Sequence, residues 1–162
     1  PIDPFYLAWK AKEYGVDARF IELAGEVNTS MPHWVVNKLI DALNNKSKAI
    51  NGSRILVLGI AYKPDIDDMS ESHAVEMMQL LQDKGAQVDY CDPHVPKSPK
   101  MRDYAFDLDS IELNATIIKN YDFVLIATNH TLFDYELINQ HAFLVVDSRG
   151  VYKEPFDTLV NA

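Results

Sequence analysis

The chain has 162 residues, 48% hydrophobic and 24% charged, an ordinary globular composition that is sufficient for one domain with an appendage. The formal net charge of −9 argues against nucleic-acid binding, because phosphate neutralisation needs clustered Lys and Arg. No apolar run approaches membrane-spanning length, and the single cysteine, Cys91, excludes an internal disulfide and fits a reducing cytoplasm. We therefore expect a cytoplasmic protein with neither a nucleic acid nor a membrane as partner.

Two helical regions are predicted at the start of the chain. Residues 4–14 begin with a proline suited to a first turn and are followed by Gly15, a typical helix end. Residues 18–44 carry apolar side chains at helical spacing and contain Pro32. Ser30 could cap a new helix there, or one long helix could bend at the proline, and the sequence leaves both open.

The apolar stripe of the second region is too long to stay in water and needs a covering partner. We expect a homodimer whose interface lies in residues 19–44 and includes Val36 and Leu39. Packing on a missing part of the same chain is the alternative. The polar segment 45–53 is predicted to be a linker, which divides the chain into residues 1–46 and 47–162.

The second part is predicted to be α/β, with a Rossmann-like parallel sheet covered by helices on both faces and preceded by the long central helix. Its expected strands are short apolar runs, as buried parallel strands require, and comprise residues 55–58, 88–91, 123–127 and 143–146. A helix is expected over residues 68–84, where Asp68 and Glu71 form a capping-box pattern. Shorter helices are expected over 110–118 and 135–140.

The loop after the first strand is the strongest candidate for a binding site. It begins at Gly59, carries Lys63, and leads into a helix whose N-terminus attracts anions. A dinucleotide cradle needs several glycines, and here Gly59 stands alone. The pattern therefore favours an anionic nucleotide other than NAD, with a purely structural turn as an equal alternative.

Four segments in chain order carry a resemblance to a known family. They are Pro1-Ile2-Asp3-Pro4-Phe5-Tyr6-Leu7, the helical run 22–36, Gly59-Ile60-Ala61-Tyr62-Lys63-Pro64 with Asp67-Asp68 and Glu71-Ser72, and Asp147-Ser148-Arg149. Together they resemble the end of the catalytic loop, the dimerisation helix and the UDP-binding domain of the UDP-glucose/GDP-mannose dehydrogenase family. Ile2, with Pro1 and Pro4, looks like the branch that acts on UDP-N-acetylglucosamine or UDP-N-acetylmannosamine.

The resemblance implies an enzyme that oxidises the C6 hydroxyl of a nucleotide sugar to a carboxylate with two NAD, through a cysteine thioester. The catalytic cysteine would lie two residues before Pro1, so this chain is expected to be an inactive fragment of the parent enzyme. Asp3 falls on the family's active-site aspartate, which assists the water and proton steps. The alternative is that Asp3 is the N-cap of the first helix.

The resemblance also implies three substrate-binding residues. Tyr62 and Lys63 fall on positions that contact the UDP-sugar, and Arg149 at a strand end suits phosphate or uracil contacts. The alternatives are a solvated Lys63 and an ion pair between Arg149 and Asp147 or a neighbouring carboxylate. Two departures from the family are Ser70, where it commonly has Arg, and His73, where it commonly has Pro.

The remaining chemistry-bearing residues predict less. The five histidines show no metal-ligand spacing, so no metal site is expected. Cys91 is predicted to be a buried strand-end residue, and Asp92 is a weak match to a ribose-binding acid. A non-catalytic module that binds nucleotide sugars or dimerises is the rival to the dehydrogenase interpretation.

Overall fold

Five parallel strands form one sheet in the computed structural model, which describes residues 2–98 and 106–162. The strand order is β2-β1-β3-β4-β5, with β1 Arg54–Leu58, β2 Gln87–Cys91, β3 Phe123–Ile126, β4 Val145–Asp147 and β5 Leu159–Asn161. The order reverses between β1 and β3, the topological switch point at which open α/β sheets bind ligands. The predicted fold class is confirmed, and β5 is a strand that the sequence analysis did not predict.

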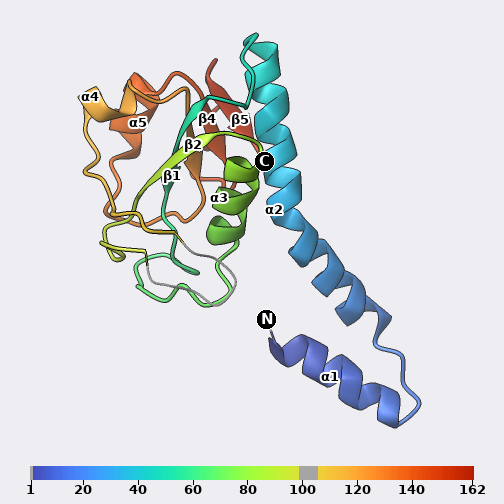
Figure 1. Ribbon diagram of the computed structural model, residues 1–162. Helices are drawn as coiled ribbons and strands as arrows, with labels where there is room; N and C mark the ends of the chain where they lie inside the picture. The colour runs from blue at the N-terminus through green and yellow to red at the C-terminus, as the bar shows by residue number, and fades with distance from the viewer. Residues whose placement is uncertain (1, 99–105) are drawn as a thin grey trace.

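Helices cover both faces of the sheet (Figure 1). The helices α2 (Arg19–Asn45) and α3 (His73–Asp83) lie on one face, and α4 (Ala115–Ile118) and α5 (Tyr135–His141) lie on the other. Successive residues of β1 point to opposite sides: Ile55 packs in the core under α2 and α3, whereas Leu56 packs in the core under α4 and α5. Each face of the sheet therefore has its own hydrophobic core.

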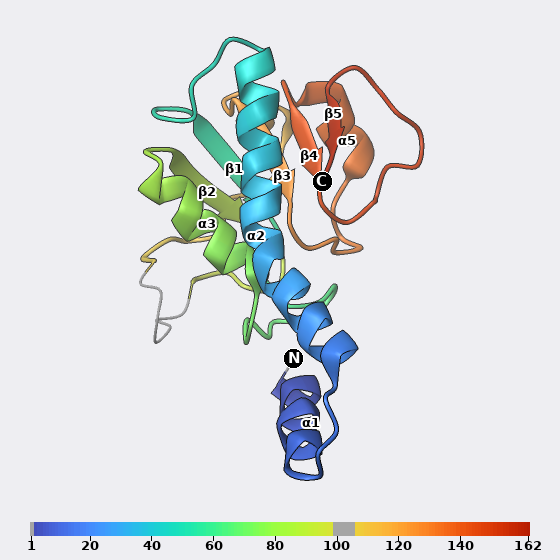
Figure 2. The ribbon, with the colours of Figure 1, turned by 90° about the vertical axis from the view of Figure 1, so that its right-hand side faces the viewer.

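The helix α2 is continuous, with Pro32 inside it, which settles the two alternatives in favour of one long helix. Its second half is part of the domain core, because Val36 is 1% and Leu39 0% exposed and both pack in the cluster that includes α3 and the sheet. The prediction that these two side chains face a partner subunit is therefore wrong. The first half extends away from the sheet (Figure 2), and there Phe20 is 90% exposed.

The first helix, α1 (Ile2–Glu13), packs against the projecting half of α2. The contact is made where the ring of Phe5 lies over Gly25, so closely that a Cβ at position 25 would come within 2.2 Å of the ring. A glycine at this position lets the two helices approach each other. Within the described residues, no helix is both long and apolar enough to cross a membrane.

Two helices begin later than the sequence predicts. The capping-box interpretation of Asp68 is wrong, because its carboxylate accepts the N–H of Ser70 and Glu71 then adopts φ +59°, which no helix allows. The helix α3 begins only after Ser72. Likewise α4 begins after Asn114, whose side chain caps it by accepting two backbone N–H groups.

Candidate functional site

A pocket of about 300 Å³ opens at the carboxyl edge of the sheet. Its lining comes from α2, from the loop between β1 and α3, from the first residue of α3 and from the segment after β4, and comprises Asn28, Tyr62, Lys63, Glu71, His73 and Arg149. The three predicted substrate-binding residues, Tyr62, Lys63 and Arg149, are thus brought to one pocket. Loops that follow parallel strands of one sheet all lie at its carboxyl edge, so the loop after β1 and the segment after β4 can reach one pocket although β3 lies between the two strands.

The start of the β1–α3 loop is held rigidly by the side chain of Asp92. Its carboxylate accepts the N–H of Ile60 at 2.7 Å and that of Ala61 at 3.2 Å, and its other oxygen accepts the N–H groups of His94 and Val95. Asp92 is 2% exposed, so these bonds are shielded from water. A carboxylate occupied in this way fixes the loop and does not bind a ribose, so the weak match to a ribose-binding acid is not supported.

Lys63 lies on the exposed part of the same loop. Its Nζ is 5.1 Å from the centroid of the Tyr62 ring, a cation–π contact that aligns the two side chains along one wall of the pocket. Among the described residues, no carboxylate forms a salt bridge with Lys63. The charge of Lys63 is therefore available to an anion in the pocket.

Arg149 is fixed from a second side. Its Nε donates to the carbonyl of Ala127 at 2.5 Å, while Asp147 accepts the backbone N–H groups of Arg149 and Tyr152. The predicted alternative, an ion pair between the guanidinium and Asp147, does not form within the described part of the chain. Burial lowers the pKa of Arg149 from its ordinary value. The guanidinium has thus lost hydration without forming a salt bridge to an acid in residues 2–98 or 106–162, which favours an anionic ligand.

His73 and Asn28 also line the pocket, and neither was predicted from the sequence to be a binding residue. His73 is half-buried, and burial lowers its pKa, with the nearby charge of Arg149 acting in the same direction against the opposing charge of Glu76. Its imidazole is therefore neutral near pH 7 and presents both a donor and an acceptor. The sequence offered one sign that position 73 is unusual, because His73 stands where the family commonly has Pro.

Asp3 lies apart from this pocket. It is exposed, sits within the first turn of α1, and is not one of the lining residues. The N-cap alternative is wrong, because the helix already begins at Ile2. Asp3 is carried by the N-terminal turn of α1, the helix that packs against the projecting half of α2.

Four residues outside the pocket, Cys91 and the group of Asp65, His94 and His130, bear on the sequence predictions. Cys91 is buried as predicted, and burial raises the pKa of its thiol to about 11, so it is not an activated nucleophile. No metal site was expected from the spacing of the histidines along the chain, yet in three dimensions His94, His130 and Asp65 bring potential ligand atoms within 4.8 Å of one another. The three residues belong to separate loops, and spacing along the chain gives no sign of their proximity.

Comparison with known proteins agrees with this architecture. Residues 56–154 match the model of the UDP-glucose/GDP-mannose dehydrogenase family, UDP binding domain. The chain is 30% identical over 154 residues to the UDP-glucose 6-dehydrogenase AglM of Haloferax volcanii, covering 93% of this chain and 34% of that protein. It is 29% identical over 160 residues to the UDP-N-acetyl-D-mannosamine dehydrogenase of Pyrococcus horikoshii, covering 96% of this chain and 35% of that protein.

The solved structure of the UDP-D-ManNAc dehydrogenase from Pyrococcus horikoshii shares the fold, with a TM-score of 0.76, 24% identity, and coverage of 98% of this chain and 36% of that one. The chain thus spans about a third of the length of the relatives that it matches. Because the family model covers more than half of the chain, including β2, β3, β4, most of β1 and the loop that carries Tyr62 and Lys63, the chain belongs to the UDP-glucose/GDP-mannose dehydrogenase family and contains its UDP-binding domain.

Proposed function

We propose that this chain is the substrate-binding part of a nucleotide-sugar 6-dehydrogenase that oxidises the C6 hydroxyl of a UDP-N-acetylhexosamine to a carboxylate with two NAD. The single observation that carries the proposal is that Lys63 and Arg149, which form no salt bridge with any described acid, line one pocket at the carboxyl edge of the sheet. Family membership supports the reaction class, and the name of the Pyrococcus horikoshii relative supports the N-acetylhexosamine class.

Each lining residue has a role in this proposal that follows from its chemistry. Lys63 neutralises the diphosphate as a mobile point charge, and Arg149 makes paired contacts to phosphate or uracil oxygens through its planar guanidinium. Tyr62 holds the Lys63 side chain along the pocket wall. His73 and Asn28 complete the pocket with neutral hydrogen-bonding groups.

The residues of this chain do not fit an NAD site. The turn after β1 has the single glycine Gly59, and its next two N–H groups already bond to Asp92 instead of facing a pyrophosphate. In the proposed parent enzyme NAD therefore binds to a part of the protein outside this chain. The chain alone is expected to bind UDP-sugar without oxidising it, and Asp3 is proposed to assist proton transfer once the catalytic cysteine is present. We place the parent enzyme in the cytoplasm.

Calorimetric titration of the chain with UDP and with NAD tests the pocket assignment. UDP should bind and NAD should not. Lys63→Ala should weaken UDP binding by about 1.5–3 kcal/mol, the usual value of a hydrogen bond to a charged group. Arg149→Lys should also weaken it, because an ammonium group cannot reproduce the planar fork.

Lys84→Ala is the matched control, since Lys84 is an exposed lysine at the other end of α3. Equal binding of UDP and NAD would refute the proposal. UDP binding that is as sensitive to Lys84→Ala as to Lys63→Ala would also refute it, because the effect would then reflect net charge alone.

We also propose that the chain forms a homodimer. Because Val36 and Leu39 are buried in the core, the proposed interface is the exposed first half of α2. Phe20 and Leu23 are 90% and 55% exposed on this half, and α1 covers only part of it. Light scattering should give a dimer at micromolar concentration. Phe20→Glu with Leu23→Glu should give a monomer, whereas Leu132→Glu, an exposed leucine in the segment before α5, should not.

A further inference from the structure

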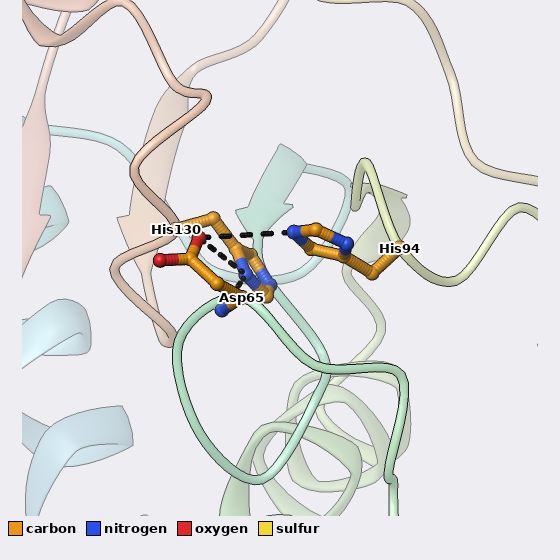
Figure 3. A group of neighbouring side chains, drawn as sticks. All are labelled: Asp65, His94 and His130. Atoms are coloured by element: carbon orange, nitrogen blue, oxygen red, sulfur yellow. Dashed lines mark hydrogen bonds and ion pairs between the residues drawn. The ribbon is translucent and has the colours of Figure 1, made fainter.

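A second group of polar side chains gathers at the carboxyl edge, outside the pocket described above (Figure 3). Asp65 belongs to the loop after β1, His94 follows β2 and His130 follows β3. The Oδ1 atom of Asp65 lies 3.7 Å from Nε2 of His94 and 3.9 Å from Nδ1 of His130. Three loops that are distant in sequence thus place three potential ligand atoms around one point.

The orientation of His94 is the first indication of a ligand. Its Nε2 atom is buried and has no hydrogen-bond partner among the described residues. A buried polar atom that loses water without gaining a partner costs free energy, so native structures rarely contain one without a reason. Figure 3 shows that this edge of the ring is turned towards Asp65.

The tautomer of His130 is the second indication. Its Nδ1 accepts the backbone N–H of Asp65 at 2.9 Å, so this nitrogen carries a lone pair and the proton resides on Nε2. The Nε2–H group then donates to the carboxylate of Asp92 at 3.0 Å. A histidine that donates one ring N–H to a carboxylate is the arrangement found around metal ions, and here the lone pair of the other ring nitrogen is occupied by the N–H of Asp65 until an ion displaces it.

Asp65 supplies the negative charge. Its Oδ1 accepts the N–H of Thr131 at 2.8 Å and the hydroxyl of Thr131 at 3.0 Å. These two hydrogen bonds stabilise the carboxylate and fix its orientation towards the two histidines. Asp65 also adopts φ +61°, an uncommon conformation for a residue other than glycine, which turns its backbone towards His130.

We propose that Asp65, His94 and His130 form a binding site for a divalent transition-metal ion of the zinc class. Two imidazoles and one carboxylate suit Zn²⁺ or Co²⁺, whereas Mg²⁺ and Ca²⁺ prefer oxygen ligands. Metal–ligand bonds of about 2.0–2.1 Å in tetrahedral geometry place ligand atoms about 3.3 Å apart, so Asp65 needs to approach each histidine by roughly half an ångström. The two histidine nitrogens lie within 4.8 Å of each other and need to converge by up to about 1.5 Å, which the half-buried His94 side chain and the exposed loop of Asp65 can supply together.

Binding of the ion replaces the hydrogen bond between the N–H of Asp65 and Nδ1 of His130 with a metal–nitrogen bond. The lone pair of His130 Nδ1 leaves the N–H of Asp65 and coordinates the ion, and a water molecule takes the fourth position. The lost hydrogen bond makes the site weaker than a fully preformed one. In return, the ion ties the loop of Asp65, two residues after Lys63, to the ends of β2 and β3.

The test is a titration of the chelator-treated chain with Zn²⁺, Co²⁺ and Mg²⁺. One equivalent of Zn²⁺ should bind and raise the melting temperature, and Co²⁺ should develop the visible absorption of a four-coordinate ion with nitrogen ligands. Mg²⁺ should do neither. His94→Ala and Asp65→Asn should each weaken Zn²⁺ binding at least tenfold, since even the loss of an outer-sphere partner costs ten- to hundredfold.

Two features keep the test decisive. His94 and Asp65 are not fully buried, so their variants should fold even if a His130 variant does not. His33→Ala is the matched control, because His33 is an exposed histidine on α2. Zn²⁺ affinity that is unchanged in His94→Ala and Asp65→Asn, affinity that falls equally in His33→Ala, or no saturable binding of Zn²⁺ would each overturn the proposal.

Discussion

The carboxylate of Asp92 and the imidazole of His130 lie 3.0 Å apart with neither side chain exposed to solvent. The same carboxylate oxygen accepts the N–H groups of Ile60 and Ala61. One buried side chain therefore connects the ends of β1, β2 and β3. The loop that presents Lys63 depends on this connection.

Asp92→Asn should destabilise the fold, even though the two side chains have the same shape. Each oxygen of the Asp92 carboxylate accepts at least two N–H groups, whereas the side-chain amide of Asn has only one accepting oxygen. In the variant the NH₂ group replaces one of the two oxygens, and the N–H donors at that position lose their acceptor. The expected loss is roughly 3 kcal/mol in the free energy of unfolding, measured by urea denaturation. Asp41→Asn, a change of the same type on the exposed side of α2, should cost nearly nothing. A loss as small as that of the control would mean that these bonds do not hold the loop.

Gly59→Ala should be far more damaging than Gly52→Ala. Both glycines have positive φ, +75° and +83°, so both substitutions strain the backbone by about 1–2 kcal/mol. At position 59 the new Cβ would also lie 2.3 Å from the carbonyl oxygen of Thr128, whereas at position 52 it meets nothing within 4 Å. The difference between the two melting temperatures measures this close approach. Equal effects would contradict it.

His73 should make stability depend on pH. Burial lowers its pKa in the folded state, so below about pH 6.5 the unfolded chain binds a proton that the folded chain does not. Stability should therefore fall as the pH drops through this range. His73→Gln should lose less stability than the wild type between pH 7 and pH 5, and Gln82→Asn on the same helix should match the wild type. The free energy of unfolding is measured by denaturation at several pH values. If it depends on pH equally in the wild type and in His73→Gln, His73 does not cause the effect.

Gly25→Ala should loosen α1 without unfolding the sheet. The added Cβ would lie within 2.4 Å of two atoms of the Phe5 ring, which must swing away and give up its packing on α2. Amide hydrogen exchange should speed up in α1 and stay slow in β1 and β3. Thr29→Ala, an exposed site one turn further along α2, serves as the comparison. Unchanged protection of α1 would show that Phe5 does not anchor it.

The sequence predicted those parts of the fold that depend on local patterns. Short apolar runs located four strands, because β-branched residues in such runs suit a sheet covered on both faces. The strand β5 was missed, since Leu159–Asn161 is short and only partly buried at the sheet edge. The start of α3 was misplaced because Asp68 resembles a helix cap but forms a turn with Ser70.

Part of the candidate pocket could be predicted because three of its residues belong to local sequence motifs. Tyr62, Lys63 and Arg149 belong to contiguous motifs that follow strands, so the topology of a parallel sheet brings them together. Asn28 reaches the pocket from α2, and no pattern within one segment encodes that approach. Burial of Val36 and Leu39 in the core was missed because an apolar helical face does not reveal whether it covers its own sheet or another chain.

Pro32 marks the point at which α2 can bend most easily. Proline has no N–H to donate to the carbonyl of Asn28 one turn earlier, so the helix is softest beside the pocket. Beyond this point α2 is embedded in the core, and before it the helix projects freely with α1. Asn28 is both the residue whose carbonyl Pro32 leaves without a donor and a residue of the pocket lining, so a bend of α2 at this point would move one wall of the pocket relative to the sheet.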